Sequence, residues 1–176
     1  KAIKIHPNFG KCYHNLGNAL AGKNHLDEAV IAYHKAIEFN PNALMSLYRL
    51  GNVLTKQEKW EEAIQMYQKT IEIDPDFSKS YDELIKILTV QERWDDLIIL
   101  CQNRLSVNPN SANLHHVLGY ALAQVGDYEQ AEQSYRQALN LNPQWDIVYR
   151  HLRQALEKQG KHQAASELSR QQTYSN

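Results

Sequence analysis

Three histidines are the residues of this chain whose types and spacing come nearest to a reactive site. His116 and His151 occupy related positions in two neighbouring segments, and His115 adjoins the first of them. Imidazole is a common zinc ligand, but a zinc site takes at least three protein ligands. We expect His115 on a buried helix face, which leaves the other two without a third ligand. The sequence therefore predicts no metal site.

Other side chains favour recognition over catalysis. The sequence shows no glycine-rich phosphate loop, nucleophile motif or supported carboxylate pair, so we predict no enzyme activity and no cofactor. Asn15, Asn18 and Asn52 carry amides that can donate to and accept from a peptide backbone, whatever its side chains. Tyr48 and Tyr120 add a ring and a hydroxyl suited to a ligand. The expected chemistry is noncovalent binding.

A repeat of 34 residues must position these side chains. The prolines mark its period: Pro7, Pro41, Pro75, Pro109 and Pro143. Two series of leucines recur with the same period: Leu16, Leu50, Leu84, Leu118 and Leu152, then Leu20, Leu54, Leu88, Leu122 and Leu156. Leucines at i and i+4 mark the apolar face of a helix. Each proline is thus followed by an amphipathic helix.

A second helix follows in each repeat. It carries a small residue in most repeats, at Ala29, Ala63 and Ala131, and four residues later an aromatic one, at Tyr33, Tyr67 and Tyr135. The turn between the helices holds Asn24, Glu58, Glu92, Gly126 or Gly160. A short hairpin cannot bury its apolar face alone, so neighbours must stack. We predict an all-α fold, a solenoid of stacked helix-turn-helix repeats.

The repeat closely resembles the tetratricopeptide repeat (TPR) family. In residues 10–43 the matching residues are Tyr13, Leu16, Gly17, Leu20, Ala29, Tyr33, Ala36 and Pro41. The resemblance spans the chain and implies a right-handed α-solenoid whose first helices line a concave groove. It is similar to bacterial TPR superhelices and to the asparagine-lined grooves of those attached to O-GlcNAc transferases. We expect a tail of a preceding repeat at 1–9, repeats at 10–43, 44–77, 78–111 and 112–145, and a partial repeat with a C-terminal cap at 146–176.

The repeat at 78–111 departs from the pattern. It has Ile85 in place of the glycine, Leu97 in place of the alanine and Cys101 in place of the tyrosine. Overpacking costs about 1 to 3 kcal/mol when nothing compensates for it. We predict a local irregularity here, with the missing tyrosine ring making room for the added bulk. The alternative is a functional bend.

A polar stripe lies opposite the leucines on the first helices. We expect it to form the partner-binding groove: Lys11, His14, Asn15, Asn18, Tyr48, Arg49, Asn52, Lys56, Lys79, Asp82, Glu83, Lys86, Asn113, His116, Tyr120, Arg150 and His151. With Met45, Gln154, Glu157 and Lys158, the stripe has seven basic and three acidic residues, whereas the whole chain has a net charge of −1. A basic stripe favours an extended acidic peptide. The alternative is a merely solvated face.

Composition excludes several other classes. The net charge of −1 gives no general attraction to nucleic acid, and no apolar run is long enough to span a membrane. Cys12 and Cys101 belong to different repeats, so we expect free thiols and a reducing, cytoplasmic compartment. We predict a non-catalytic scaffold or adaptor that binds a protein or peptide. The alternative is a regulatory or substrate-presenting segment of a larger enzyme such as a glycosyltransferase.

The start of the chain falls inside an expected helix. Lys1 is not a methionine, so we expect a piece of a longer chain from which upstream repeats and any targeting signal are missing. Ile3 and Ile5 would then form an exposed apolar edge. Such an edge favours end-to-end self-association.

Overall fold

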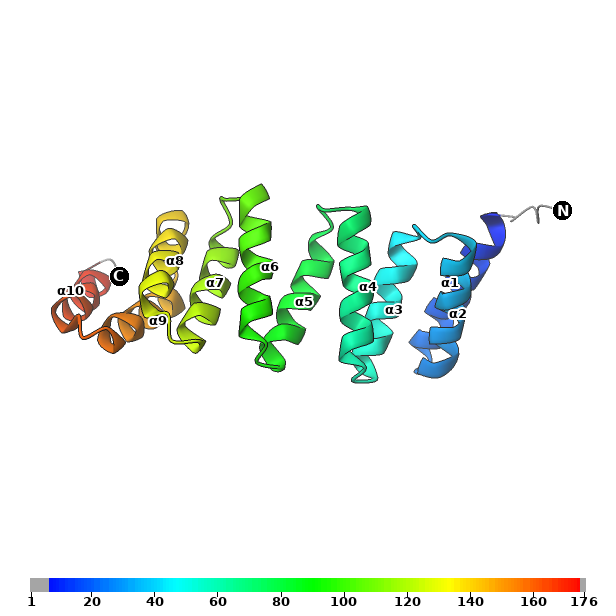
Figure 1. Cartoon of the computed structure of the whole chain (residues 1–176), viewed down its shortest axis with the longest axis horizontal. Coiled ribbons are helices and arrows are strands. Elements are labelled where there is room, and N and C mark those ends of the chain that lie inside the picture. Colours follow the sequence, from blue (N-terminus) through cyan, green and yellow to red (C-terminus); the bar gives the residue numbers. More distant parts are fainter. Residues whose placement is uncertain (1–6, 175–176) are drawn as a thin grey trace. The chain divides into compact units, whose positions relative to one another are not determined.

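Ten helices make up the part of the chain that the structure describes (Figure 1). The computed structural model describes the backbone of residues 7–174 and the side-chain surroundings of residues 9–168. The helices are α1 (Pro7–Gly22), α2 (Leu26–Phe39), α3 (Leu44–Lys56), α4 (Trp60–Ile73), α5 (Ser78–Val90), α6 (Trp94–Val107), α7 (Ala112–Gln124), α8 (Tyr128–Leu141), α9 (Asp146–Lys158) and α10 (His162–Tyr174). The predicted all-α fold of stacked helix-turn-helix repeats is confirmed.

The chain divides into two compact units. The N-terminal unit is Lys1–Ile87 and the C-terminal unit is Leu88–Asn176, so the boundary falls within α5, in the repeat that departs from the pattern. In the N-terminal unit α1 packs on α2, α2 on α3 and α3 on α4, and α1 also touches α3. In the C-terminal unit each helix from α6 to α10 packs on the next, and α7 also touches α9. Within each unit the first helices of neighbouring repeats therefore lie side by side.

The tyrosine of each second helix fills the space left by the glycine of the first. A Cβ atom added to Gly17 would lie 2.6 Å from the ring of Tyr33, and one added to Gly51 would lie 2.7 Å from that of Tyr67. Gly119 relates to Tyr135 in the same way. These distances are too short for any side chain, so the glycine and the ring must occur together. The three rings are at most 1% exposed.

A left-handed residue closes every hairpin. Asn24, Glu58 and Glu92 have φ values of 62°, 59° and 54°, and Gly126 and Gly160 have 86° and 75°. The residue after each donates its amide to a carbonyl five positions earlier, as in the bonds from His25 to Leu20 and from Lys59 to Leu54. This is the Schellman ending of a helix. Two of the turns therefore place a glutamate in a conformation that glycine adopts more easily.

Eight of the ten periodic leucines are buried, whereas Leu20 is half-buried and Leu16 is exposed. Leu50, Leu84 and Leu152 are at most 2% exposed, whereas Leu16 is 47% exposed. The expectation that Leu16 would be buried like its equivalents is therefore wrong. Its place is on the outer side of α1, the first helix described, where α2 and α3 do not cover it. The two thiols also differ, because Cys12 is exposed while Cys101 is buried.

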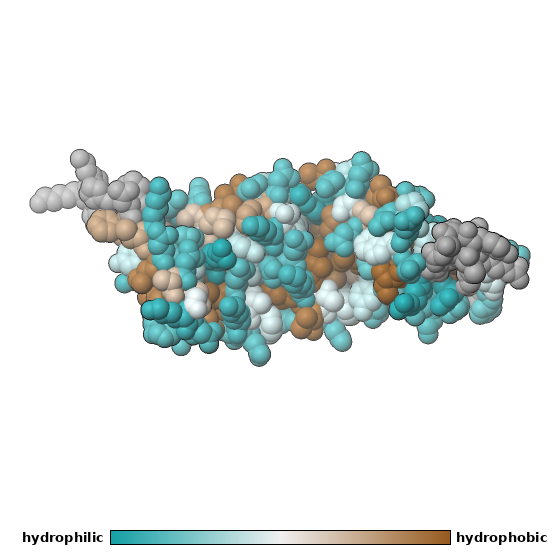
Figure 2. Space-filling view, turned by 180° about the vertical axis from the view of Figure 1, so that it is seen from behind, coloured by the Kyte–Doolittle hydropathy of each residue, from teal (hydrophilic) through white to brown (hydrophobic). Residues whose placement is uncertain are grey.

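The structure describes helix α1 from Pro7 onward. Residues 7–9 of the predicted tail thus belong to α1, while Ile3 and Ile5 lie outside the described residues. The view from behind shows mostly hydrophilic side chains, with hydrophobic ones emerging between them (Figure 2). In the described part of the chain, no helix has the length and apolar character needed to cross a membrane.

Candidate functional site

A polar pocket opens between α1 and α3 of the N-terminal unit. It has a volume of about 510 Å³ and brings together Asn18, Arg49, Asn52 and Lys56, all predicted groove residues. Its other lining residues are small or apolar apart from Tyr33, and none is acidic. Arg49 and Lys56 are exposed. The pocket therefore combines amides with two positive charges.

Buried tyrosines hold the two asparagines in place. The hydroxyl of Tyr33 donates to Oδ1 of Asn18 over 2.8 Å, and that of Tyr67 donates to Oδ1 of Asn52 over 2.8 Å. Thr55 also shares a hydrogen bond with Tyr67 at 3.1 Å. In this part of the structure the amide nitrogens of both asparagines have no protein partner. They are left to donate to a ligand.

A second pocket of the N-terminal unit is more apolar. It has a volume of about 560 Å³ and lies where α1 meets the end of α2 and the start of α3, with Lys11, His14 and Asn15 on one side. Nδ1 of His14 lies 3.0 Å from the hydroxyl of Ser46, which is 3% exposed. Burial, and then the positive charge of Arg49, lower the pKa of His14. His14 is therefore an uncharged wall of this pocket at neutral pH.

Two of the four predicted groove residues of α5 form an ion pair. The amine of Lys86 lies 2.8 Å from a carboxylate oxygen of Glu83. The hydrogen bond to Glu83, and then its negative charge, raise the pKa of Lys86. Lys79 and Asp82 lie exposed on the same helix. The excess of positive charge in the N-terminal unit is thus centred on Arg49 and Lys56 rather than on α5.

The predicted histidine pair does form in the C-terminal unit. Nε2 of His116 on α7 lies 3.0 Å from Nδ1 of His151 on α9, and the two rings stack with their centroids 5.2 Å apart. Trp145 packs against His116 at 4.9 Å. Burial, and then His151, lower the pKa of His116 to about 4. Burial, and then Arg150, lower the pKa of His151, so both rings are neutral at pH 7.

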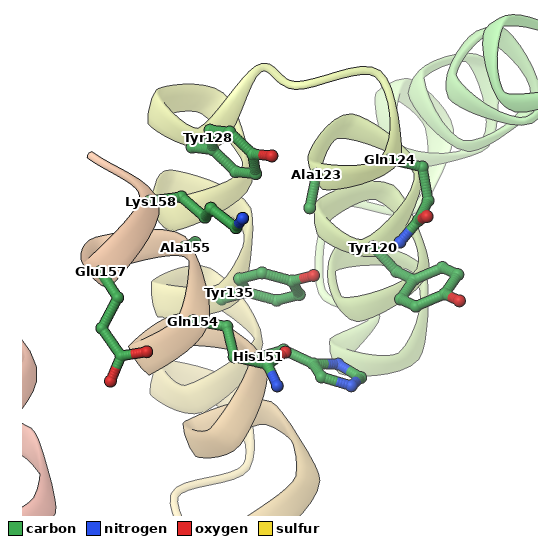
Figure 3. A pocket seen from close by; sticks show the side chains of 10 residues that line it. All are labelled: Tyr120, Ala123, Gln124, Tyr128, Tyr135, His151, Gln154, Ala155, Glu157 and Lys158. Carbon is green, nitrogen blue, oxygen red and sulfur yellow. The ribbon is translucent and has the colours of Figure 1, made fainter. Parts of the chain in front are cut away.

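An aromatic pocket adjoins this pair. It has a volume of about 640 Å³ and lies between α7, α8 and α9 (Figure 3). Tyr120, Tyr135 and His151 form its walls, with the methyl groups of Ala123 and Ala155 beside them. No group of three or more potential metal ligands occurs among the described residues. The pocket can pack against a ligand and form hydrogen bonds with it.

The two tyrosines expected to meet a ligand are half-buried and partly packing residues. Tyr48 lies edge-on to Phe77, with centroids 5.3 Å apart, and close to Tyr67. Tyr120 lies edge-on to Trp94 at 5.8 Å. Asn113 and Arg150 are exposed on α7 and α9 and do not line any of the three pockets described above. The structure thus distributes the predicted residues over three separate pockets and the surface around them.

Sequence reasoning missed the hydroxyls of the buried tyrosines. Tyr33, Tyr67 and Tyr135 are expected only as packing residues, yet two of them reach the candidate site. The available signal was the spacing, because Asn18 precedes Tyr33 by the same interval at which Asn52 precedes Tyr67. At that interval before Tyr135 stands Tyr120 instead of an asparagine.

Stacked hairpins locked by a glycine and a tyrosine define a helical repeat protein. Models of the tetratricopeptide repeat match residues 10–43, 45–77 and 112–145, which together make up more than half of the chain. The chain belongs to the tetratricopeptide repeat family. A search of curated protein sequences returned no significant match.

Several solved structures of low sequence identity share this fold. The chain is similar to MamA (41-end) from Desulfovibrio magneticus RS-1, with 17% identity, a TM-score of 0.72 and coverage of 94% of this chain and 93% of that one. A crystal structure of MamA protein has 21% identity, a TM-score of 0.77 and coverages of 94% and 90%. YrrB, described as a TPR protein with an unusual peptide-binding site, has 22% identity, a TM-score of 0.69 and coverages of 89% and 80%. These likenesses show the shared fold.

Proposed function

We propose that this chain is a non-catalytic interaction scaffold that binds an extended, acidic peptide or partner segment along the first helices of the N-terminal unit. The observation that carries the proposal is the pocket in which tyrosine-held amides stand beside Arg49 and Lys56. Fixed amides recognise a peptide backbone without regard to its side chains. The two cations then favour carboxylates or phosphates among those side chains.

The rigidity of the asparagines supports this role. A side chain already held in one orientation loses little conformational entropy when a ligand binds, so more of its hydrogen-bond energy goes into affinity. Asn18 and Asn52 lie on neighbouring first helices and are held by equivalent bonds. Two matching donors in a row suit an extended backbone, whose carbonyl groups recur regularly.

The remaining predicted groove residues are included as contacts within each unit. The N-terminal set adds Lys11, His14, Asn15 and Tyr48 around the pocket and Lys79, Asp82, Glu83 and Lys86 on α5, and a separate C-terminal set holds Asn113, His116, Tyr120, Arg150 and His151. Because Lys86 is already paired with Glu83, we expect it to contribute less than Arg49. YrrB, a neighbour in fold, is described as having a peptide-binding site, which supports a peptide ligand here.

The proposal includes no catalysis, no nucleic-acid binding and no membrane insertion. A net charge of −1 provides no broad electrostatic attraction to a phosphate backbone. We place the chain in the cytoplasm, since two unpaired thiols are typical of a reducing compartment.

A charge-reversal experiment tests the proposal. The probe is an acetylated, amidated peptide that alternates glutamate with glycine and serine, and its neutral glutamine analogue is the reference. Arg49→Glu combined with Lys56→Glu should weaken binding of the acidic probe by about tenfold, measured by fluorescence anisotropy at low salt, because attraction becomes repulsion.

Lys59→Glu combined with Lys69→Glu is the matched control. Both lysines are exposed, and neither lines the pocket. The control makes the same change in net charge, so general electrostatics would lower the affinity of both variants equally. Equal losses, or undiminished binding by the Arg49 and Lys56 variant with an unaltered thermal midpoint, would refute the proposed site.

A further inference from the structure

The buried tyrosine of the C-terminal unit differs from its two equivalents in one respect. Tyr33 and Tyr67 donate their hydroxyls to asparagines on the adjacent first helix. Tyr135 is equally buried, at 1% exposed. The residue that would accept its proton is replaced by Tyr120, and among residues 9–168 the Tyr135 hydroxyl makes no hydrogen bond. This hydroxyl is not one of the fully buried polar atoms that lack a partner, so it opens onto a pocket and can donate to an acceptor from outside the chain.

The hydroxyl of Tyr135 faces the aromatic pocket. Figure 3 shows it directed into the space between α7 and α9, with Tyr120 on the far side. Burial, and then the neighbouring phenol of Tyr120, raise the pKa of Tyr135, so its proton remains available for donation. The pocket volume of about 640 Å³ is far larger than a water molecule requires.

A second donor reaches the same space. The amine of Lys158 is turned toward the pocket and lies above Tyr135 in the view of Figure 3, whereas the carboxylate of Glu157 points away. Glu157 also lines the pocket, but its carboxylate lies 3.8 Å from the guanidinium of Arg153. A phenol and an ammonium group without a facing carboxylate match an anionic acceptor with two oxygens.

We propose that this pocket binds an aspartate or glutamate side chain of a partner peptide, next to an aromatic residue of the same peptide. The carboxylate would accept from Tyr135 and Lys158. The neighbouring aromatic ring would pack against Tyr120 and His151, because the pocket is several times larger than a single acidic side chain and its walls are ring faces and methyl groups. The inference rests on the proposed role in peptide binding, but it names a different site, in the other unit.

Nuclear magnetic resonance titration of the 176-residue chain tests this inference. The probe is the acetylated, amidated hexapeptide Ser-Gly-Glu-Phe-Gly-Ser, and its reference replaces the glutamate with glutamine. The glutamate probe should shift the amide resonances of Ala123 and Ala155 and bind at least about fivefold more tightly than the reference. Tyr135→Phe and Lys158→Gln should each weaken it by about tenfold, as expected for the loss of a hydrogen bond to a charged group.

Tyr67→Phe is the matched control, because it removes the equivalent hydroxyl from the N-terminal unit. It should leave the shifts at Ala123 and Ala155 unchanged. Undiminished affinity in Tyr135→Phe, or no shift at either alanine at millimolar probe, would overturn the inference. Equal binding by a glutamine peptide with a free C-terminal carboxylate would also overturn it, in favour of a terminal group. The shifts of Asn18 and Asn52 report separately on the proposed function, so either site can fail alone.

Discussion

The N-terminal and C-terminal units place the same tyrosine in the same glycine-lined space but give its hydroxyl different surroundings. In the N-terminal unit Tyr67 donates to Asn52, and the asparagine becomes part of a rigid polar pocket with positive charges. In the C-terminal unit Tyr120 stands where the asparagine would, and the hydroxyl of Tyr135 opens into an aromatic pocket. The exchange of asparagine for tyrosine on the first helix thus replaces an internal hydrogen bond with a hydroxyl that faces a pocket. The scaffold stays constant while the chemistry of its inner helices changes.

Removal of the tyrosine ring should have the largest effect and should not distinguish the units. Tyr67→Ala and Tyr135→Ala each delete a ring that is at most 1% exposed, so each should lower the free energy of unfolding by about 3 to 5 kcal/mol. Urea titration followed by circular dichroism measures the loss. A loss near zero in either unit would mean that the ring is not part of the core there.

Removal of the hydroxyl alone should separate the units. Tyr67→Phe breaks the bonds to Asn52 and Thr55 and should cost about 1 to 2 kcal/mol. Tyr135→Phe removes a donor without a protein partner, so its unfolding free energy should change by less than about 0.5 kcal/mol. The same urea titration applies. Equal costs at the two positions would show that Tyr135 has a hydrogen-bond partner in solution.

Acidification should weaken the C-terminal unit. The pKa of His116 is lowered to about 4 from an ordinary value of 6.5, so between these values the unfolded chain binds a proton that the folded chain does not. Stability should therefore fall as the pH drops from 7 to 5.5. We expect a loss of about 1 kcal/mol, smaller than full linkage gives because the ring is partly exposed.

His116→Asn provides the comparison for this pH dependence. It should flatten the decrease in the unfolding free energy between pH 7 and pH 5.5, measured by the fluorescence of the tryptophans. His14 in the N-terminal unit also has a lowered pKa, so the variant should reduce the slope without abolishing it. An unaltered slope would contradict a half-buried His116 that is neutral at pH 7.

The smallest effect concerns the turns. Glu58 in the N-terminal unit has a φ of 59°, and Gly126 occupies the equivalent turn in the C-terminal unit. Glu58→Gly should stabilise the chain by about 0.5 to 1 kcal/mol because glycine adopts this conformation without strain. Gly126→Glu should destabilise it by a similar amount. The thermal midpoints of the two variants measure both changes. Shifts of the same sign would contradict the backbone conformation as their common cause.

Periodicity made the helices predictable. The prolines recur between the repeats, and the leucines mark the apolar face of each first helix. The left-handed conformation of the turn was predictable at Gly126, because glycine favours it. At Glu58 it was predictable only because Glu58 occupies the equivalent position of its repeat. The packing partner of each glycine was harder to predict from the sequence, since it depends on where a ring from another helix lies. Leu16 follows the pattern of buried leucines, yet it is 47% exposed, because burial depends on a neighbouring hairpin and not on the residue itself.

The candidate site was less predictable than the helices. Helical spacing placed Asn18, Asn52 and Arg49 on one face, but it could not show that Tyr33 and Tyr67 fix the amides. The charge count was also incomplete, because Lys86 and Glu83 form an ion pair, which local spacing permits but does not require. Pairwise contacts between helices decide such details, and the spacing of residues along one helix does not contain them.

The two thiols provide a simple experimental handle. Cys12 is exposed, while burial raises the pKa of Cys101 to about 12 and shields it from reagents. Only the thiolate reacts readily with alkylating dyes. A maleimide fluorophore should therefore label α1 at one position in the otherwise unaltered chain, next to Lys11 at the rim of a pocket. The arrival of a peptide could then be followed as a change in emission without introducing a single mutation.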